Sequence, residues 1–432
     1  MRAIDEATLA ALEGSRPADS LTVWAWRDGS LVVPEPLDVI SWSFTDEAGE
    51  NVKVGQKVSL TVADPDGTLG AWRFDDPLGV AGTKLQIIYR VGGAGAVNYC
   101  WCRVIGNEPS VMVDSRVVNE YGLIVPDSAD EPHTRRIYID KGIVRLEAVD
   151  LTIDVDRDRF ESPESPGADA SALSEFARLT QEHFPTVVDD GVDDVDVSRQ
   201  LVFDRERLDA CQDLLARVGA RYRMGGDGEC HVYPLVTDPV WRVEPNAGLI
   251  NVARKQSLDG LYNRWVVEGQ DQTEGEPIRG VVSIETGPLR WGGPHGRAPY
   301  FYRSEMIRTQ SQAIGYAVVL RRAFLASLAI ELDVETVPRP ELQGGDRIEV
   351  GCPFEGRVVY VTGTITGVRR AGSPVPNRTQ FTVSCSYADV ASALSRTEWA
   401  ENLTDEKPPL TWDRLPGSWG SLPEWTWDEL PA

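Results

Sequence analysis

The chain has 432 residues, of which 42% are hydrophobic and 25% charged, a composition typical of a folded protein with more than one core. Its 67 acidic residues outnumber its 43 basic residues, so its formal net charge is −24 at pH 7. A surface this acidic repels phosphate backbones and argues against specific nucleic-acid binding. Short apolar runs and a polar N-terminal stretch argue against integral membrane association and a signal peptide, so we expect synthesis in a cytoplasm.

Residues 1–158 are expected to form a β domain. Apolar spacing predicts a short helix over 4–13. The strands of a hairpin are expected on either side of Asp28-Gly29, a pair that favours the positive-φ turn. Further strands are predicted at 58–62, 84–91, 99–105, 135–139 and 143–155. Many short strands with regular turn signals indicate a β-barrel or sandwich.

Helical periodicity becomes strong in residues 159–327, which are expected to form an α+β domain. One helix is predicted over 171–184, and a second begins at Asp204 as N-cap and ends at Gly219. A hairpin follows, with the turn G-G-D-G at 225–228, which we interpret as a plain turn rather than a phosphate cradle.

The later part of this domain contains an irregular β region and one long helix. Irregular β structure is expected over 250–310. The helix is predicted over 309–327, because Thr309 and Gln312 match a capping box.

Residues 328–395 are expected to form a second β-barrel-like domain. Its strands are predicted at 330–337, 346–350, 358–368 and 380–387, and Gly344-Gly345-Asp346 is predicted to be a turn before the second of these. The predicted fold class is therefore α+β, mainly β. It has two small barrel- or sandwich-like domains, a helix-containing domain between them and an extended arm at 396–432.

The arm contains three related phrases, T-W-D-R-L-P, S-W-G-S-L-P and T-W-D-E-L-P. Proline after leucine disfavours a helix, so an extended or polyproline-like segment is predicted. Tryptophan on an extended chain is a good anchor for a groove. We predict an interaction arm that docks on the assembly or a tip protein, the alternative being that it folds back on its own chain. The docking residues are predicted to be Trp412, Leu415, Trp419, Leu422, Trp427 and Leu430.

Acidic runs at 154–158 and 189–196 invite a calcium interpretation. The first does not fit an EF-hand loop, because Arg159 stands where glycine is required and Ser165 where the loop needs its last glutamate. The sequence therefore predicts solvated acidic loops and no metal site.

The reactive side chains do not form a recognisable catalytic motif. Six cysteines without a C-x-x-C pair predict free thiols in a reducing compartment. The four histidines lie in different predicted elements, and no hydrolase or phosphate-loop motif is present. We predict no enzymatic activity and no cofactor.

Three groups of segments, in this order and spacing, resemble the tail-hub or baseplate-hub family (minor tail proteins) of long-tailed actinobacterial phages. They are V-S-L-T-V-A-D-P-D-G-T-L with D-P-L-G-V-A-G-T-K-L-Q-I, then R-L-D-A-C-Q-D-L-L-A-R-V-G-A-R-Y, then A-V-V-L-R-R-A-F-L-A-S-L-A-I-E-L-D-V with P-E-L-Q-G-G-D-R-I-E-V. The matching positions are structural in that family, so the resemblance implies no catalytic residue.

The resemblance implies a homotrimer whose paired barrels form a ring. Such a ring closes the tail tube, adapts sixfold to threefold symmetry and opens for DNA passage. The implied partners are the distal tail protein, the tape-measure protein and other tail-tip or receptor-binding proteins. The implied location is the tail tip of the virion, after assembly in the host cytoplasm. An acidic lumen would keep DNA from sticking.

Two other functions stay open at this point. One is a distal-tail adaptor or a receptor-binding tip protein, which would lack a pair of tube-forming domains. The other is a tail-associated cell-wall hydrolase, for which the residues after 395 provide little room for a catalytic domain.

Overall fold

The computed structural model describes residues 1–14, 19–118, 124–125, 135–235, 238–245, 247–269, 278–373 and 376–395. The chain divides into two compact units, which are described separately. Unit 1 comprises residues 1–253, 333–349 and 364–383, and unit 2 comprises residues 254–332, 350–363 and those from 384 onward. The division into four segments expected from the sequence stays a prediction.

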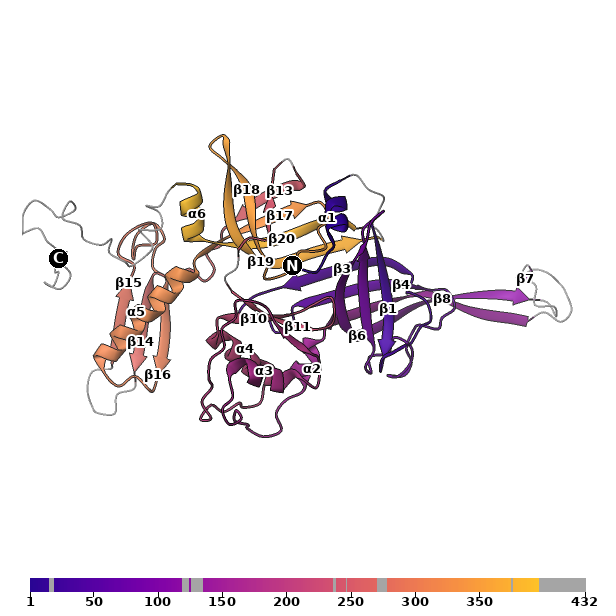
Figure 1. Cartoon of the computed structure of the whole chain (residues 1–432), viewed down its shortest axis with the longest axis horizontal. Coiled ribbons are helices and arrows are strands. Elements are labelled where there is room, and N and C mark those ends of the chain that lie inside the picture. The colour runs from indigo at the N-terminus through magenta and orange to yellow at the C-terminus, as the bar shows by residue number, and fades with distance from the viewer. Residues whose placement is uncertain are drawn as a thin grey trace, which may run out of the picture. The chain divides into compact units, whose positions relative to one another are not determined.

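The described structure is mostly β, with a large antiparallel sheet and few helices, so the mainly-β fold class is confirmed. Strands of the large sheet follow the order β17-β20-β19-β3-β4-β8-β6-β5-β1-β2, most of which are labelled in Figure 1. From the first half of the chain these are β1 (Ser20–Arg27), β2 (Ser30–Leu31), β3 (Val39–Glu47), β4 (Gln56–Asp64), β5 (Lys84–Arg90), β6 (Ala96–Val118) and β8 (Arg135–Asp150), with β7 (Ile124–Val125) paired to β6.

The second half of the chain contributes strands that have residues in both units. They are β13 (Leu249–Lys255), β17 (Ala329–Thr336), β18 (Arg347–Phe354), β19 (Arg357–Gly372) and β20 (Pro376–Ser386); β12 (Trp241–Val243) pairs with β18. The strands predicted at 330–337, 346–350, 358–368 and 380–387 are thereby confirmed.

Local sequence signals explain the N-terminal elements of unit 1. The side chain of Asp5 accepts a hydrogen bond from Thr8 N at 2.8 Å and caps α1 (Glu6–Glu13). The hairpin between β1 and β2 turns through Asp28 and Gly29, whose φ angles are 48° and 75°, as predicted. In β4 every second side chain is buried, which is the pattern of a strand with one face on the core.

Two expectations in this region are corrected. Strand β3 was not predicted, although Trp42 and Phe44 alternate with polar residues and are buried. The segments predicted as strands at 135–139 and 143–155 form one strand, β8, which ends at Asp150. The Asp150 carboxylate accepts hydrogen bonds from Gln56 N at 2.7 Å and Thr152 N at 3.0 Å, so the chain turns there into α2 (Thr152–Arg157).

The remainder of unit 1 includes three helices beside a small sheet. Alongside α2 lie α3 (Ala172–Thr180) and α4 (Arg207–Arg217), and the sheet has the order β10-β11-β9 (Figure 1). Its strands are β9 (Thr186–Val188), β10 (Ala220–Met224) and β11 (Cys230–Pro234), so the predicted hairpin is confirmed.

Both predicted helix positions in this region are confirmed with shifted ends. The helix expected over 171–184 ends at Thr180. The helix expected from Asp204 has Glu206 as its N-cap instead, because Phe203 and Arg205 are held in backbone hydrogen bonds to Glu164 and Phe160.

Unit 2 contains a three-stranded sheet covered on one face by a long helix. The sheet has the order β15-β14-β16, formed by β14 (Arg264–Gly269), β15 (Arg279–Ser283) and β16 (Pro299–Ser304), so regular strands lie where irregular structure was expected. Helix α5 (Gln310–Ser327) lies along this sheet (Figure 1), and its predicted capping box of Thr309 and Gln312 is confirmed. A further helix, α6 (Tyr387–Ala393), was not predicted.

The residues described include no helix long and apolar enough to cross a membrane.

The contact between α5 and β15 depends on a glycine. A Cβ on Gly280 would lie 2.2 Å from the carbonyl carbon of Ala313, so only glycine allows the helix to approach the strand this closely. Gly315 lies on the same helix with nothing within 4 Å of its would-be Cβ.

We predict that Gly280→Ala lowers the free energy of unfolding of unit 2 by about 1–3 kcal/mol, because the helix must move away from the sheet. The matched Gly315→Ala should raise it by up to about 1 kcal/mol, because alanine favours an exposed helical position. Urea unfolding followed by circular dichroism measures both, and equal effects of the two substitutions would contradict the assigned packing.

Candidate functional site

The loop at 339–346 in unit 1 receives two buried arginines that are far apart in the chain, Arg2 and Arg370, each 4% exposed. Arg2 donates hydrogen bonds to the carbonyl oxygens of Tyr99 and Leu342, both at 2.8 Å, and to the Asp46 carboxylate at 3.2 Å. Arg370 donates to the carbonyl oxygens of Arg339 at 2.6 Å and Leu342 at 2.9 Å. We call Arg2, Asp46, Tyr99, Arg370 and this loop the arginine junction.

Tyr99 contacts both guanidinium groups. Its ring centroid is 4.6 Å from the guanidinium carbon of Arg2 and 5.1 Å from that of Arg370. Arg370 also donates a hydrogen bond to the Tyr99 hydroxyl. Burial raises the pKa of the Tyr99 phenol, against the opposing effect of Arg370 and Arg2, so the phenol stays neutral. The two cations thus gain a neutral aromatic partner in the interior.

The hairpin of β10 and β11 is attached to the same loop. Arg223 from β10 donates a hydrogen bond to the Asp346 carboxylate at 2.9 Å. A Cβ on Gly345 would lie 2.4 Å from the Tyr233 hydroxyl oxygen, and Gly345 has a φ of +88°. The predicted turn at Gly344-Gly345-Asp346 is therefore confirmed, but the arginines that converge on it were not predicted.

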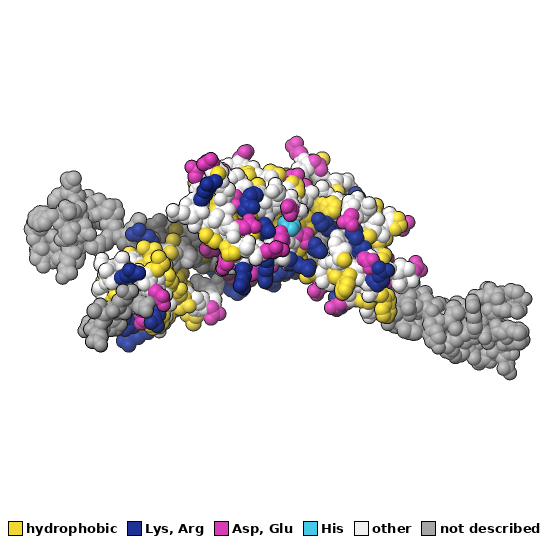
Figure 2. Space-filling model, turned by 90° about the horizontal axis from the view of Figure 1, so that it is seen from below, with side chains coloured by type: hydrophobic (Ala, Val, Ile, Leu, Met, Phe, Trp, Pro, Cys, Tyr) yellow, Lys and Arg dark blue, Asp and Glu magenta, His cyan; other side chains and the backbone are white. Residues whose placement is uncertain are grey.

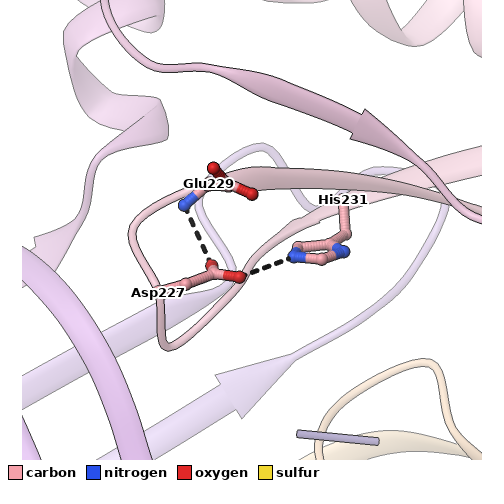
Figure 3. A group of neighbouring side chains, drawn as sticks. All are labelled: Asp227, Glu229 and His231. Carbon is pink, nitrogen blue, oxygen red and sulfur yellow. Dashed lines mark hydrogen bonds and ion pairs between the residues drawn. The ribbon is translucent and has the colours of Figure 1, made fainter. Parts of the chain in front are cut away.

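The hairpin also contains a small cluster of titratable side chains (Figure 3). His231 on β11 places Nε2 3.2 Å from the Asp227 carboxylate and Nδ1 3.1 Å from that of Asp189. Asp227 also accepts a hydrogen bond from Glu229 N at 3.0 Å. We call these four residues the histidine cluster.

Both nitrogens of His231 face carboxylates, which favours the doubly protonated imidazolium. Partial burial opposes the charged form, but the hydrogen bonds to Asp189 and Asp227 outweigh it and raise the pKa of His231. The cluster therefore works as a protonated clamp between β11, the turn before it and the chain after β9.

The histidine cluster also contains donor atoms that suit a divalent cation. Ligand atoms of Asp227, Glu229 and His231 lie within 4.8 Å of one another. To bind a metal ion, His231 would have to release its proton, so binding would compete with the clamp. That the protein contains no metal site stays a prediction.

Two carboxylates of the acidic run at 189–196, predicted to be a solvated loop, accept hydrogen bonds from other parts of the chain. Asp189 belongs to the histidine cluster, and Asp194 accepts a hydrogen bond from Leu173 N at 3.0 Å at the start of α3. Asp194 is exposed and Asp189 partly exposed, which agrees with a loop in contact with solvent. The two hydrogen bonds were not predicted, because their partners lie elsewhere in the chain.

A loop in unit 1 exposes two aromatic side chains. Trp72 is 98% exposed and Phe74 is 76% exposed. Asp76 fixes the loop by accepting hydrogen bonds from Trp72 N at 2.9 Å and Arg73 N at 2.8 Å. Arg27 donates to the carbonyl oxygen of Asp76 at 2.8 Å. Exposed aromatics on a pre-ordered loop are typical of protein interfaces.

The structure tests the prediction for the cysteines but not the one for the docking residues. All six cysteines are buried free thiols, as predicted. The predicted docking residues Trp412, Leu415, Trp419, Leu422, Trp427 and Leu430 lie outside the described residues.

No family model matches the chain. A comparison with curated protein sequences found no match either.

Two solved structures of tail proteins are similar along nearly their whole length. The tail protein from Neisseria meningitidis MC58 is 10% identical with a TM-score of 0.51, and the match covers 88% of this chain and 99% of that chain. The 43 kDa tail protein of prophage MuSo2 from Shewanella oneidensis is 9% identical with a TM-score of 0.53, and the match covers 86% and 99%. What this chain shares with both is the fold.

We predict that Arg370→Ala lowers the free energy of unfolding by about 3–5 kcal/mol, because buried oxygens lose their donors. Arg370→Lys should recover only part of this, because an ammonium group cannot reproduce the guanidinium fork. Arg369, the exposed neighbour, provides the control: Arg369→Ala should change stability by less than about 0.5 kcal/mol. Denaturant unfolding measures all three, and similar values for Arg370→Ala and Arg369→Ala would count against the junction.

We predict that His231→Gln is destabilising at acidic pH and has little effect at alkaline pH. The folded-state pKa lies above the ordinary value of 6.5. The imidazolium therefore adds stability that is fully present below pH 6.5 and is lost as pH rises through the folded-state pKa.

At low pH we expect His231→Gln to lower the free energy of unfolding by about 0.5–1 kcal/mol, a small value because solvent screens the exposed part of the cluster. Thermal unfolding between pH 5 and 9 measures it. His295→Gln, which removes a ring that contacts the Leu261 carbonyl oxygen, is the control. A loss of stability that does not change with pH would refute the clamp.

Proposed function

We propose that this chain is a structural, non-catalytic component of a phage tail. The observation that carries the proposal is the fold, which matches two tail proteins over nearly their entire length. The rigid arginine junction and the pre-ordered Trp72 loop support it, because an assembly protein needs a stiff scaffold that presents contact residues.

Within the tail, we assign the chain to the hub at the tip. It forms a homotrimer that closes the tail tube, adapts sixfold to threefold symmetry and opens for DNA passage. Its neighbours are the distal tail protein, the tape-measure protein and other tip or receptor-binding proteins of a long-tailed actinobacterial phage. The support is the order of the three hub-like groups of segments in the sequence.

Charge supports passage of DNA without tight binding. One chain has a net charge of −24, and a trimer would have three times this negative charge. On the face drawn in Figure 2, both acidic and basic side chains are exposed. The proposal places an acidic excess along the lumen of the trimer.

The lack of catalysis is supported by the environment of the titratable groups. Tyr99 and His231 have shifted pKa values. Burial in the core raises the pKa of Tyr99, and hydrogen bonds to Asp189 and Asp227 raise that of His231 against partial burial. These groups therefore have structural reasons for their shifts.

The segment after Leu403 is proposed to act as the interaction arm. Its tryptophans would dock on the hub, on a neighbouring subunit or on another tip protein. Serial anchors on one chain increase avidity without requiring a large interface.

The test is cryo-electron microscopy of particles assembled with the full chain or with a chain that ends at Leu403. We expect three copies at the tail tip for the full chain. We expect a folded, soluble truncated chain that is incorporated into fewer tails, because it lacks the anchors. Replacing Trp412, Trp419 and Trp427 together by alanine keeps the length and is the matched control for the anchors.

Several outcomes would contradict parts of this proposal. A copy number other than three would overturn the trimeric hub. Normal incorporation of the truncated chain would overturn the arm. Clearing of cell wall by the purified protein on a zymogram would overturn the non-catalytic assignment.

A further inference from the structure

Unit 2 contains an apolar groove made of two adjoining hollows of about 470 Å³ and 670 Å³. The hollows share Gln256, Ile330 and Tyr387 in their walls, so they lie next to each other. Volumes of this size are typical of ligand sites. We call the two hollows together the tail groove.

The walls of the tail groove are mainly hydrophobic. In the first hollow, α6 contributes Val390, and Leu394 follows directly after the helix. In the second hollow, Phe324 of α5 and the exposed Leu258 line the walls. Solvent contact with these side chains costs free energy, which a docked apolar segment would recover.

The position of the last described residues identifies the occupant. Leu394 lines the groove, Ser395 turns the chain with a φ of +56°, and residues 396–432 follow. An extended chain covers about 3.3 Å per residue. The link from Ser395 to Trp412 therefore reaches about 56 Å at most, enough to return to any part of a groove that starts beside Leu394.

The spacing within each arm phrase suits two adjoining hollows. Trp412 and Leu415 are three residues apart, and a polyproline II helix has three residues per turn with a rise of about 3.1 Å per residue. The two side chains would then lie on the same face about 9 Å apart. The tryptophan fits one hollow and the leucine the other.

Charge favours the same arrangement. Arg254 lines the first hollow, whereas in the second hollow Lys255 forms an ion pair with Glu331 at 3.7 Å. The phrase places Asp413 between its two anchors. A carboxylate beside Arg254 is attracted to the rim of the first hollow.

We propose that the first arm phrase, residues 411–416, docks in the tail groove of its own chain. This inference rests on the proposed interaction arm for the second and third phrases, and for the first phrase it takes the alternative, that the segment folds back on its own chain. Tethering gives this phrase a high effective concentration, because the link is short. The phrases with Trp419 and Trp427 stay available for partners in the tail.

The test uses the full-length protein with the photo-crosslinking substitution Trp412→p-benzoylphenylalanine. After irradiation at low protein concentration, we expect cross-links within one molecule to peptides that contain residues 330–332, 352–354 or 387–394. Mixing isotopically light and heavy protein separates intramolecular from intermolecular products. Cross-links between copies, cross-links to other surfaces or a lack of cross-links would overturn the inference.

Two pairs of variants test the groove and the phrase separately. In the groove, Ile330→Asp should lower the yield of the intramolecular cross-link about tenfold, because it places a carboxylate in the apolar wall. Ile250→Asp is the control, since Ile250 is 49% exposed and does not line the groove. In the arm, Leu415→Asp should lower the yield similarly, and Leu410→Asp, before the phrase, should not.

The outcomes are distinguishable from those of the proposed function. The arm variants keep the sequence of the body unchanged, so they stay informative if Ile330→Asp destabilises the fold. An unchanged yield in Leu415→Asp would overturn the docking. Three copies at the tail tip without intramolecular cross-links would overturn this inference and leave the hub assignment intact.

Discussion

The arrangement of unit 1 depends on the need to pair two buried guanidinium groups. An arginine in the interior is tolerated only when its donors and its charge are satisfied. Arg2 and Arg370 achieve this with carbonyl oxygens of the loop at 339–346, the ring of Tyr99 and the carboxylate of Asp46. Because these partners come from β3, β6 and the loop, the arginines fix those segments in one arrangement.

A rigid scaffold is what the proposed role in a tail would require at contact surfaces. The hydrogen bonds of Asp76 and Arg27 hold the Trp72 loop before any partner arrives. Ordering a loop only on binding would reduce affinity, so a loop ordered in advance contributes to tight contacts from few residues. The tail groove is likewise formed in advance, because α5, α6 and strands provide its walls, so a docked segment would not have to order it.

The acidic character of the chain also has a local structural use. Asp5 caps α1, Asp150 ends β8, and Asp194 accepts a backbone hydrogen bond at the start of α3. Asp189 and Asp227 raise the pKa of His231 and so favour its protonated form. A part of the negative charge therefore determines where elements begin, end and join, in addition to setting the charge of the surface.

The sequence by itself determined the features that depend on a few adjacent residues. The Asp28-Gly29 hairpin and the capping box of Thr309 were predictable because a turn or a cap depends on local φ angles and nearby side chains. Only the tertiary structure decided the arginine junction, the contact between Asp189 and His231, and the end of β8 at Asp150. The groups that stabilise each of these are distant in the chain, and hydrophobic periodicity carries no information about which distant side chains will pair.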